Sequence, residues 1–337
     1  MNRFQRYISS ACHDFVWALL TLALLGTPPA LADVRPNNPD AAEQPTVSVS
    51  VLQFGTAHWA LDHLKRQGID HANGFDLDVH LVANLPASHL AVSSGNVDGA
   101  VADLLWAQAR YEAGDPYVYL PFSSQIGEIV VPLDSPVRSV SDLPGRRIGV
   151  AGGPDSKGWV LLKRVAANQG IDLDSVAEVQ YAAPPLLSQA LKRGQLDVLV
   201  TYWHFAARLR ASGDARSAFG MADLLDDLGL SHDLPVLGYV FHKSWADAHP
   251  GALAAFARAL NQGNQSLAAN DASWDALRPL MQSPDEATFR VLRAGLIAGF
   301  PGPLNQARID DLRRLLTLAG TAPQRRMPED LFVRLQP

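Results

Sequence analysis

The sequence is poor in cysteine, in charge and in long apolar runs. Cys12 is the only cysteine and stands before the first apolar run, which argues against a lipoprotein anchor and leaves the rest of the chain without a thiol for chemistry. Charged residues make up 18% and the formal net charge is −6, which excludes a broad basic field for nucleic acid. The hydrophobic share of 47% in 337 residues fits one large or two mid-sized globular domains.

Catalytic and metal-binding motifs are also missing. The chain has no nucleophile elbow, no His-Glu-x-x-His sequence and no paired carboxylates at a convincing spacing. We therefore expect no enzyme activity and no cofactor. Five histidines are close in sequence (His58, His63, His71, His80, His89), but they miss the i, i+4 spacing of ligands on one helix face. Scattered solvated histidines and no metal site are predicted, with a metal carrier as a remote alternative.

The N-terminus has the pattern of a secretory signal. Arg3 and Arg6 precede the apolar run 15–25, and Ala30-Leu31-Ala32 forms a small-x-small cleavage site. We expect a signal peptide at 1–32, a flexible leader at 33–45 and a periplasmic protein. An uncleaved membrane anchor is the alternative, although the apolar run is about half of the roughly 20 residues that a spanning helix needs.

Short β-branched runs alternate with helical patterns from Thr46 onward, which predicts βαβ units with a largely parallel sheet. A helix stop, Gly95-Asn96-Val97-Asp98, is followed by a strand at 97–101, and Gly194-Gln195-Leu196-Asp197 by a strand at 196–201. The repetition favours two similar lobes, with Asp98 and Asp197 as structural residues. A chance match of a common helix stop is the alternative.

Beyond residue 250 the patterns are helical, at 250–270, 271–281, 285–299 and 305–319, with prolines at the boundaries. This tail is expected to cover the first lobe. We therefore assign 46–125 plus 240–337 to lobe 1 and 126–239 to lobe 2, joined by a two-strand hinge.

Several segments resemble one family in order and spacing. These segments are Gly74-Phe75-Asp76-Leu77-Asp78-Val79, Ser94-Gly95-Asn96-Val97-Asp98, Val130-Val131-Pro132-Leu133-Asp134-Ser135, Ser141-Asp142-Leu143-Pro144-Gly145-Arg146-Arg147-Ile148-Gly149-Val150 and Arg193-Gly194-Gln195-Leu196-Asp197. Over 46–260 the chain is similar to the periplasmic substrate-binding proteins of nitrate-, taurine- and thiamine-precursor-type ABC transporters. The resemblance implies an α/β type II periplasmic-binding-protein fold, closure over a small-molecule ligand and delivery to an ABC transporter permease. We expect a monomer.

Ligands of open α/β sheets bind outside the carboxyl ends of the strands, so the strand-exit loops supply the candidate site. From these loops we predict eleven ligand-binding residues: His58, Trp59, Asp103, Trp106, Gly153, Ser156, Lys157, Trp159, Tyr202, Trp203 and His204. The tryptophans favour a planar ring or an alkylated ammonium group. The glycine-rich turn 152–158 precedes a helix whose amides suit a carboxylate, phosphate or sulfonate.

Each candidate also has a structural reading. In that reading the tryptophans pack on the sheet, Asp103 and either Asp155 or Ser156 cap helices, and His204 is a satisfied surface histidine. We predict an exported protein that captures a small organic molecule with an aromatic or hydrophobic part and a polar or anionic group. The alternative is an exported enzyme or accessory factor of a periplasmic oxidation system on the same fold.

Overall fold

Two five-stranded sheets organise the chain. The computed structural model describes residues 44–334, so the predicted signal peptide and residues 33–43 of the leader lie outside the described residues. The first sheet has the order β2 (Asp76–Val82), β1 (Thr46–Leu52), β3 (Gly99–Asp103), β10 (Leu237–His242) and β4 (Tyr117–Ser123). The second has the order β7 (Glu178–Ala182), β6 (Arg147–Ala151), β8 (Val198–Thr201), β5 (Glu128–Val131) and β9 (Arg216–Gly220).

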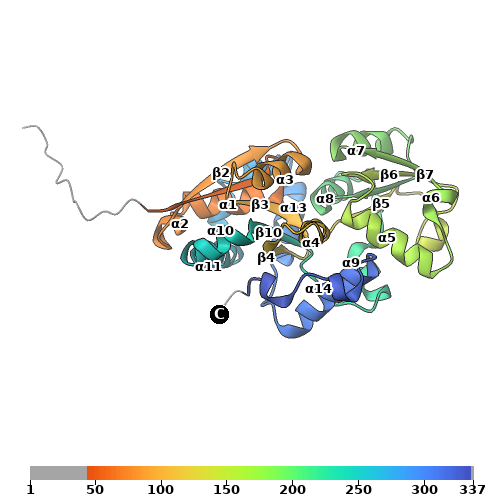
Figure 1. Cartoon of the computed structure of the whole chain (residues 1–337). Helices are drawn as coiled ribbons and strands as arrows, with labels where there is room; N and C mark the ends of the chain where they lie inside the picture. Colours follow the sequence, from red (N-terminus) through yellow and green to blue (C-terminus); the bar gives the residue numbers. More distant parts are fainter. Residues whose placement is uncertain (1–43, 335–337) are drawn as a thin grey trace, which may run out of the picture. The chain divides into compact units, whose positions relative to one another are not determined.

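Helices connect and cover the strands (Figure 1). Before β5 they are α1 (Thr56–Arg66), α2 (Ile69–Ala72), α3 (Leu85–Ser93) and α4 (Leu104–Glu112). Between β6 and β10 they are α5 (Lys157–Asn168), α6 (Leu173–Val176), α7 (Pro184–Lys192), α8 (Trp203–Ala211) and α9 (Met221–Asp227). After β10 come α10 (Lys243–Ala248), α11 (Pro250–Ala269), α12 (Arg278–Met281), α13 (Glu286–Ala298) and α14 (Gln306–Leu318). Among the described residues no helix combines the length and the apolar character needed to cross a membrane.

The same carboxylate contact recurs in both sheets. Asp98 Oδ2 accepts hydrogen bonds from the backbone N–H (2.8 Å) and the hydroxyl (2.7 Å) of Ser48 at the start of β1. Asp197 Oδ2 accepts from the backbone N–H of Arg147 (2.9 Å) at the start of β6, and its Oδ1 pairs with the guanidinium (2.6 Å). Each carboxylate ties a strand start to its neighbour. The prediction that both residues are structural is therefore confirmed.

The fold class is confirmed as α/β, with parallel pairs β1–β2, β1–β3, β6–β7 and β6–β8. Strand β3 begins two residues later than predicted because Asp98 belongs to the turn that binds Ser48. The pattern 271–281 does not form one helix but breaks into a 3-10 turn, Asp271–Trp274, and the short α12. Strand β9 was not predicted, since all five of its residues are half-buried and lack an apolar alternation.

The sequence analysis expected the C-terminal helices to cover the first lobe, but they contact elements of both sheets. Helix α14 packs on α4, which connects strands of the first sheet, whereas α13 packs along α8, which connects strands of the second. At this contact Trp203 of α8 lies against Gly295 of α13 and meets Trp59 of α1 edge to face at 6.4 Å. The tail therefore binds elements of both sheets, because the apolar face of α13 requires the cover that Trp203 and Ala207 provide.

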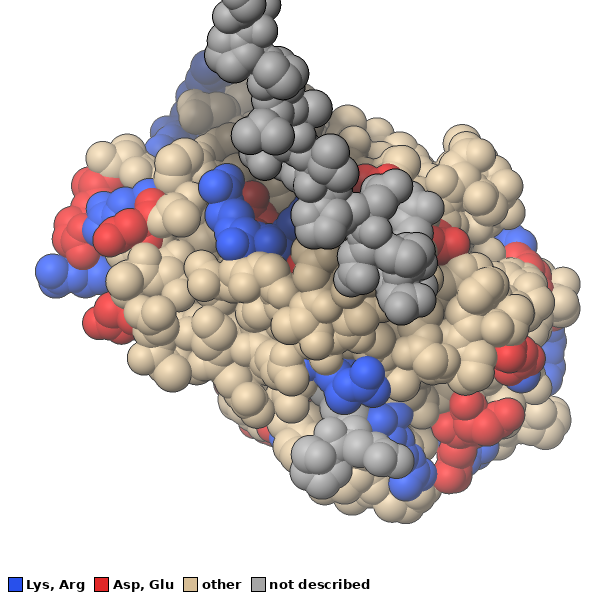
Figure 2. Space-filling model, turned by 90° about the vertical axis from the view of Figure 1, so that its left-hand side faces the viewer, with Lys and Arg blue, Asp and Glu red and all other residues tan. Residues whose placement is uncertain are grey.

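Many charged side chains on the surface form ion pairs. On the face drawn in Figure 2, Lys and Arg lie interspersed with Asp and Glu. The ion pairs Lys65–Asp76 (3.1 Å) and Lys243–Asp247 (2.7 Å) are examples. Exposed pairs of this kind add little stability, at most about 1 kcal/mol each.

The contact of α13 with α8 depends on a glycine. A Cβ at Gly295 would lie 2.9 Å from Cε3 of Trp203 and closer still to Cζ3. We expect Gly295→Ala to lower the free energy of unfolding by about 1 to 2 kcal/mol through overpacking, measured by urea denaturation. The matched control is Gly263→Ala in α11, where a Cβ would lie 3.7 Å from Leu64. That control should gain up to about 1 kcal/mol from helix propensity. Equal effects of the two changes would contradict the packing role of Gly295.

Candidate functional site

A cavity of about 390 Å³ lies where strand ends of both sheets meet. Its size suits a small organic molecule. Its walls contain Asp103 at the end of β3 and Trp106 after it, the loop 152–158 after β6, Thr201 at the end of β8 and Tyr202 after it. A smaller cavity of about 70 Å³ adjoins it, since both are lined by Leu85, Ile126, Lys157 and Tyr202. We call the two cavities together the cleft.

The loop after β6 approaches the cleft with its backbone. Gly152 and Gly153 have φ angles of 97° and 128°, which residues other than glycine rarely adopt. A Cβ at Gly152 would also lie 2.9 Å from the Tyr202 hydroxyl. The loop leads into α5, whose first residues Lys157 and Gly158 line the larger cavity. The first amides of a helix have no partner within the helix. This backbone can therefore donate hydrogen bonds to an anionic group.

Lys157 opens α5 and lines both cavities. Burial lowers the pKa of its ammonium, and the nearby Asp103 carboxylate opposes that shift. Within residues 44–334, no carboxylate lies close enough to Lys157 to form an ion pair. Lys157 is half-buried, and an ammonium partly removed from water without a direct counter-ion would be stabilised by an anionic ligand group.

Four buried polar atoms of the cleft have no hydrogen-bond partner among the described residues. They are His89 Nε2, Ser156 Oγ, Thr201 Oγ1 and His204 Nε2. Buried polar atoms in folded proteins are almost always hydrogen-bonded, so a group of exceptions at one cavity needs an explanation. Atoms of a bound ligand or ordered water satisfy them best.

Asp103 and Trp106 combine a helix cap with an aromatic wall. Asp103 Oδ1 accepts from the Trp106 backbone N–H at 2.9 Å, so Asp103 caps α4 while its side chain also lines the larger cavity. Trp106 stacks on His89 with ring centroids 4.5 Å apart and planes at 23°. The pair offers a flat surface to a ring or an apolar segment.

The structure brings eight of the eleven predicted site residues to the cleft. Asp103, Trp106, Gly153, Ser156, Lys157 and Tyr202 line the larger cavity, and Trp203 and His204 line the smaller. His204 is no surface histidine, because it is 5% exposed. Burial, and then the charge of Arg208, lower the pKa of His204 to about 3.

Three predicted residues lie elsewhere. Trp59 and Trp159 are 0% exposed and belong to the core, as in the alternative reading that they pack on the sheets. The Nδ1–H of His58 donates to the Gln53 carbonyl (2.9 Å), and His58 lines a separate surface hollow beside Asp62. Each follows a strand exit, but the turn of its helix directs the side chain away from the cleft.

His89 is the main residue that the sequence analysis missed. It was counted among scattered solvated histidines, but its Nε2 is buried, and burial lowers its pKa against the opposing effect of Asp103. The available signal was its position on the first turns of the helix that Asn84 caps, directly after a predicted strand exit.

Known proteins share this architecture. Residues 71–273 match the family model described as NMT1/THI5 like. No curated protein matches the chain. The alkanesulfonate-binding protein from Xanthomonas axonopodis pv. citri bound to MOPS is 21% identical, with a TM-score of 0.67 over 87% of this chain and 99% of that one. The periplasmic aliphatic sulphonate binding protein from Escherichia coli is 16% identical, with a TM-score of 0.65 over 81% and 91%.

A third solved structure names the fold. A Candida albicans protein described as having the generic periplasmic binding protein structural fold is 14% identical, with a TM-score of 0.58 over 86% of this chain and 92% of that one. At these identities the likeness shows the fold, and the predicted periplasmic-binding-protein fold is confirmed.

The buried His204 predicts an acid-sensitive stability. Its pKa in the folded state, about 3, is below the ordinary value of 6.5, so the unfolded state binds more protons between these values. The neutral, buried His204 therefore does not lower the free energy of unfolding above pH 6.5. As the pH drops toward 3, the free energy of unfolding falls, and at pH 5 it is lower by about 2 kcal/mol. We expect His204→Gln to lose less stability than the wild type between pH 7 and pH 5 in urea denaturation. The exposed His80 is the control site, and an equal pH dependence in His204→Gln and His80→Gln would contradict the assignment.

Proposed function

The chain belongs to the NMT1/THI5-like family, and from this premise we propose that it is an exported solute-binding protein of an ABC transporter. It captures a small organic molecule in the cleft between the two sheets and delivers it to a permease. The mature protein acts in the periplasm, after removal of the signal peptide predicted at 1–32.

The observation that carries this proposal is the set of unsatisfied polar atoms around one cavity. Lys157 lacks a counter-ion, and Ser156 Oγ and Thr201 Oγ1 lack hydrogen-bond partners among the described residues. A site that leaves these groups unpaired is costly when empty of polar partners and is stabilised when a ligand supplies them. This arrangement is typical of a binding site whose polar groups are already placed to bind a polar ligand.

The geometry favours a ligand with an anionic end and an apolar end. The anionic group binds at the start of α5, where the backbone amides and Lys157 converge. The rest of the ligand packs on Trp106 and on neighbouring apolar side chains such as Leu105 and Ile126. The relatives described as binding alkanesulfonates and aliphatic sulphonates support a sulfonate or a similar organic anion.

Binding and closure are linked in such a site. A ligand that contacts Trp106 beside the first sheet and Lys157 beside the second binds best when the two sides are close together. It therefore shifts the population toward the closed form. The permease distinguishes the loaded receptor by this closed form.

Native mass spectrometry tests the carrier role. Protein purified gently from the periplasm should show a bound mass that is lost on denaturation, and the released molecule should be chemically unchanged.

Lys157 provides the first test of the anion site. In calorimetric titrations with methanesulfonate, benzenesulfonate, benzoate and nitrate, Lys157→Met should weaken binding of the best organic anion by at least about tenfold. Lys163→Met is the matched control, because Lys163 lies on the same helix but pairs with Asp174 at 3.0 Å. Equal affinity in Lys157→Met and the wild type would refute the anion site, and conversion of the ligand would identify an enzyme.

Trp106 provides the second test. If the apolar part of the ligand packs on this ring, Trp106→Ala should weaken benzenesulfonate binding by about three- to tenfold. Methanesulfonate, which has no ring to stack, should lose much less. The ratio of the two dissociation constants is the readout, and an unchanged ratio would exclude Trp106 from the apolar part of the site.

A further inference from the structure

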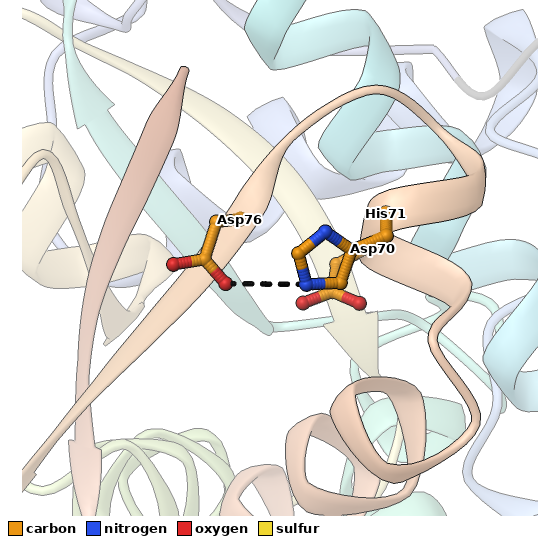
Figure 3. Close-up of side chains that lie close together, drawn as sticks. All are labelled: Asp70, His71 and Asp76. Carbon is orange, nitrogen blue, oxygen red and sulfur yellow. Dashed lines mark ion pairs between the residues drawn. The ribbon is translucent and has the colours of Figure 1, made fainter. Parts of the chain in front are cut away.

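A second group of polar side chains lies at the turn between α2 and β2, and the cleft proposal does not involve it. Asp70, His71 and Asp76 each place one nitrogen or oxygen atom within 4.8 Å of the others' (Figure 3). His71 Nε2 and Asp76 Oδ1 are 3.6 Å apart. These three donors come from seven consecutive residues, so the turn itself holds them together.

Asp70 is the unusual member of the group. Its side chain is 0% exposed, and Oδ2 accepts a hydrogen bond from the Leu77 N–H at 3.1 Å. Its Oδ1 is also buried and has no partner among the described residues. A buried carboxylate needs full pairing or a cation, so Oδ1 indicates a missing positive group.

Gln44 fixes the state of the His71 ring. The Gln44 amide nitrogen donates to the His71 carbonyl at 3.2 Å, which sets the orientation of the amide. Its oxygen then accepts from His71 Nδ1 at 3.0 Å, so Nδ1 carries a proton. In the neutral ring Nε2 is left with its lone pair, and this lone pair faces the Asp76 carboxylate. Metal-binding histidines are commonly held in this way by a partner on the second ring nitrogen.

We propose that Asp70, His71 and Asp76 bind a divalent zinc ion, with water completing a tetrahedral shell. One imidazole nitrogen and two carboxylate oxygens are a donor set that zinc accepts. Bonds of about 2.0 to 2.2 Å place tetrahedral donors about 3.3 to 3.6 Å apart, and His71 Nε2 and Asp76 Oδ1 are 3.6 Å apart at present. The ion supplies the charge that Asp70 Oδ1 lacks.

Lys65 competes with the ion in the present structure. Its ammonium donates to Asp76 Oδ1 at 3.1 Å and also to the Leu77 carbonyl. Zinc must displace this ammonium from Oδ1 and then lies beside its charge. Removing the charge of Lys65 should therefore strengthen zinc binding. If zinc bound only to an isolated surface histidine, its affinity would not depend on Lys65.

Calorimetric titration of the exported protein with ZnCl₂ tests the assignment, with the visible absorption of tetrahedral Co²⁺ as an independent readout. The wild type should bind one ion at this site. His71→Ala and Asp70→Asn should each weaken that binding by at least about tenfold, since even outer partners of a metal site contribute about 10- to 100-fold. Lys65→Met should tighten it by about three- to tenfold.

His80 and Asp78 on β2 form the matched control. They pair at 2.8 Å with exposed side chains, as an ordinary surface pair without a buried third donor. His80→Ala should leave zinc affinity and the cobalt spectrum unchanged. The assignment is overturned if the wild type binds no zinc, if His80→Ala loses as much affinity as His71→Ala, or if Lys65→Met does not bind more tightly. Circular dichroism of each variant checks that the fold is kept.

Discussion

Two half-buried carboxylates, Asp98 and Asp197, set the geometry on which the cleft depends. Each binds the backbone of a residue fifty positions earlier, Ser48 and Arg147, and so aligns the starts of two parallel strands. The neighbouring pairs Val49–Gly99 and Ile148–Val198 keep the same offset. Once the strand starts are aligned, the strand ends are aligned too, and the loops that line the cleft lie at one edge of each sheet.

Much of the fold follows from local sequence rules. The βαβ order, the glycine stops at Gly95 and Gly194 and the capped helices α13 and α14 depend on residues close in sequence, and the structure agrees with them. The packing of α13 along α8 was not predictable in this way, because it depends on Trp203 meeting Gly295, ninety-two residues later. Strand β9 was missed for a related reason, since its pairing with β5 does not require an apolar pattern.

The site was predictable at the level of loops but not of side-chain direction. The rule that ligands bind at strand ends located Ser156, Lys157 and Tyr202, because it depends on topology alone. Trp59 and Trp159 lie in the first turns of helices at the same edge, but both rings are buried in the core. Removing the area of such a large ring from water is favourable by about several kcal/mol, and the turn of the helix allows the ring to face the core. Whether a first-turn tryptophan faces ligand or core is decided by packing partners that a single sequence does not show.

The position of β10 determines the order in which the chain can fold. This strand lies between β3 and β4 and pairs with both, but it begins only at Leu237, after the whole second sheet. During synthesis β4 has no sheet to join until β10 has emerged from the ribosome, so the first half of the chain cannot complete its core early. A first sheet that is completed late suits the export that we propose, because transport across a membrane in the unfolded state requires a chain that has not yet folded.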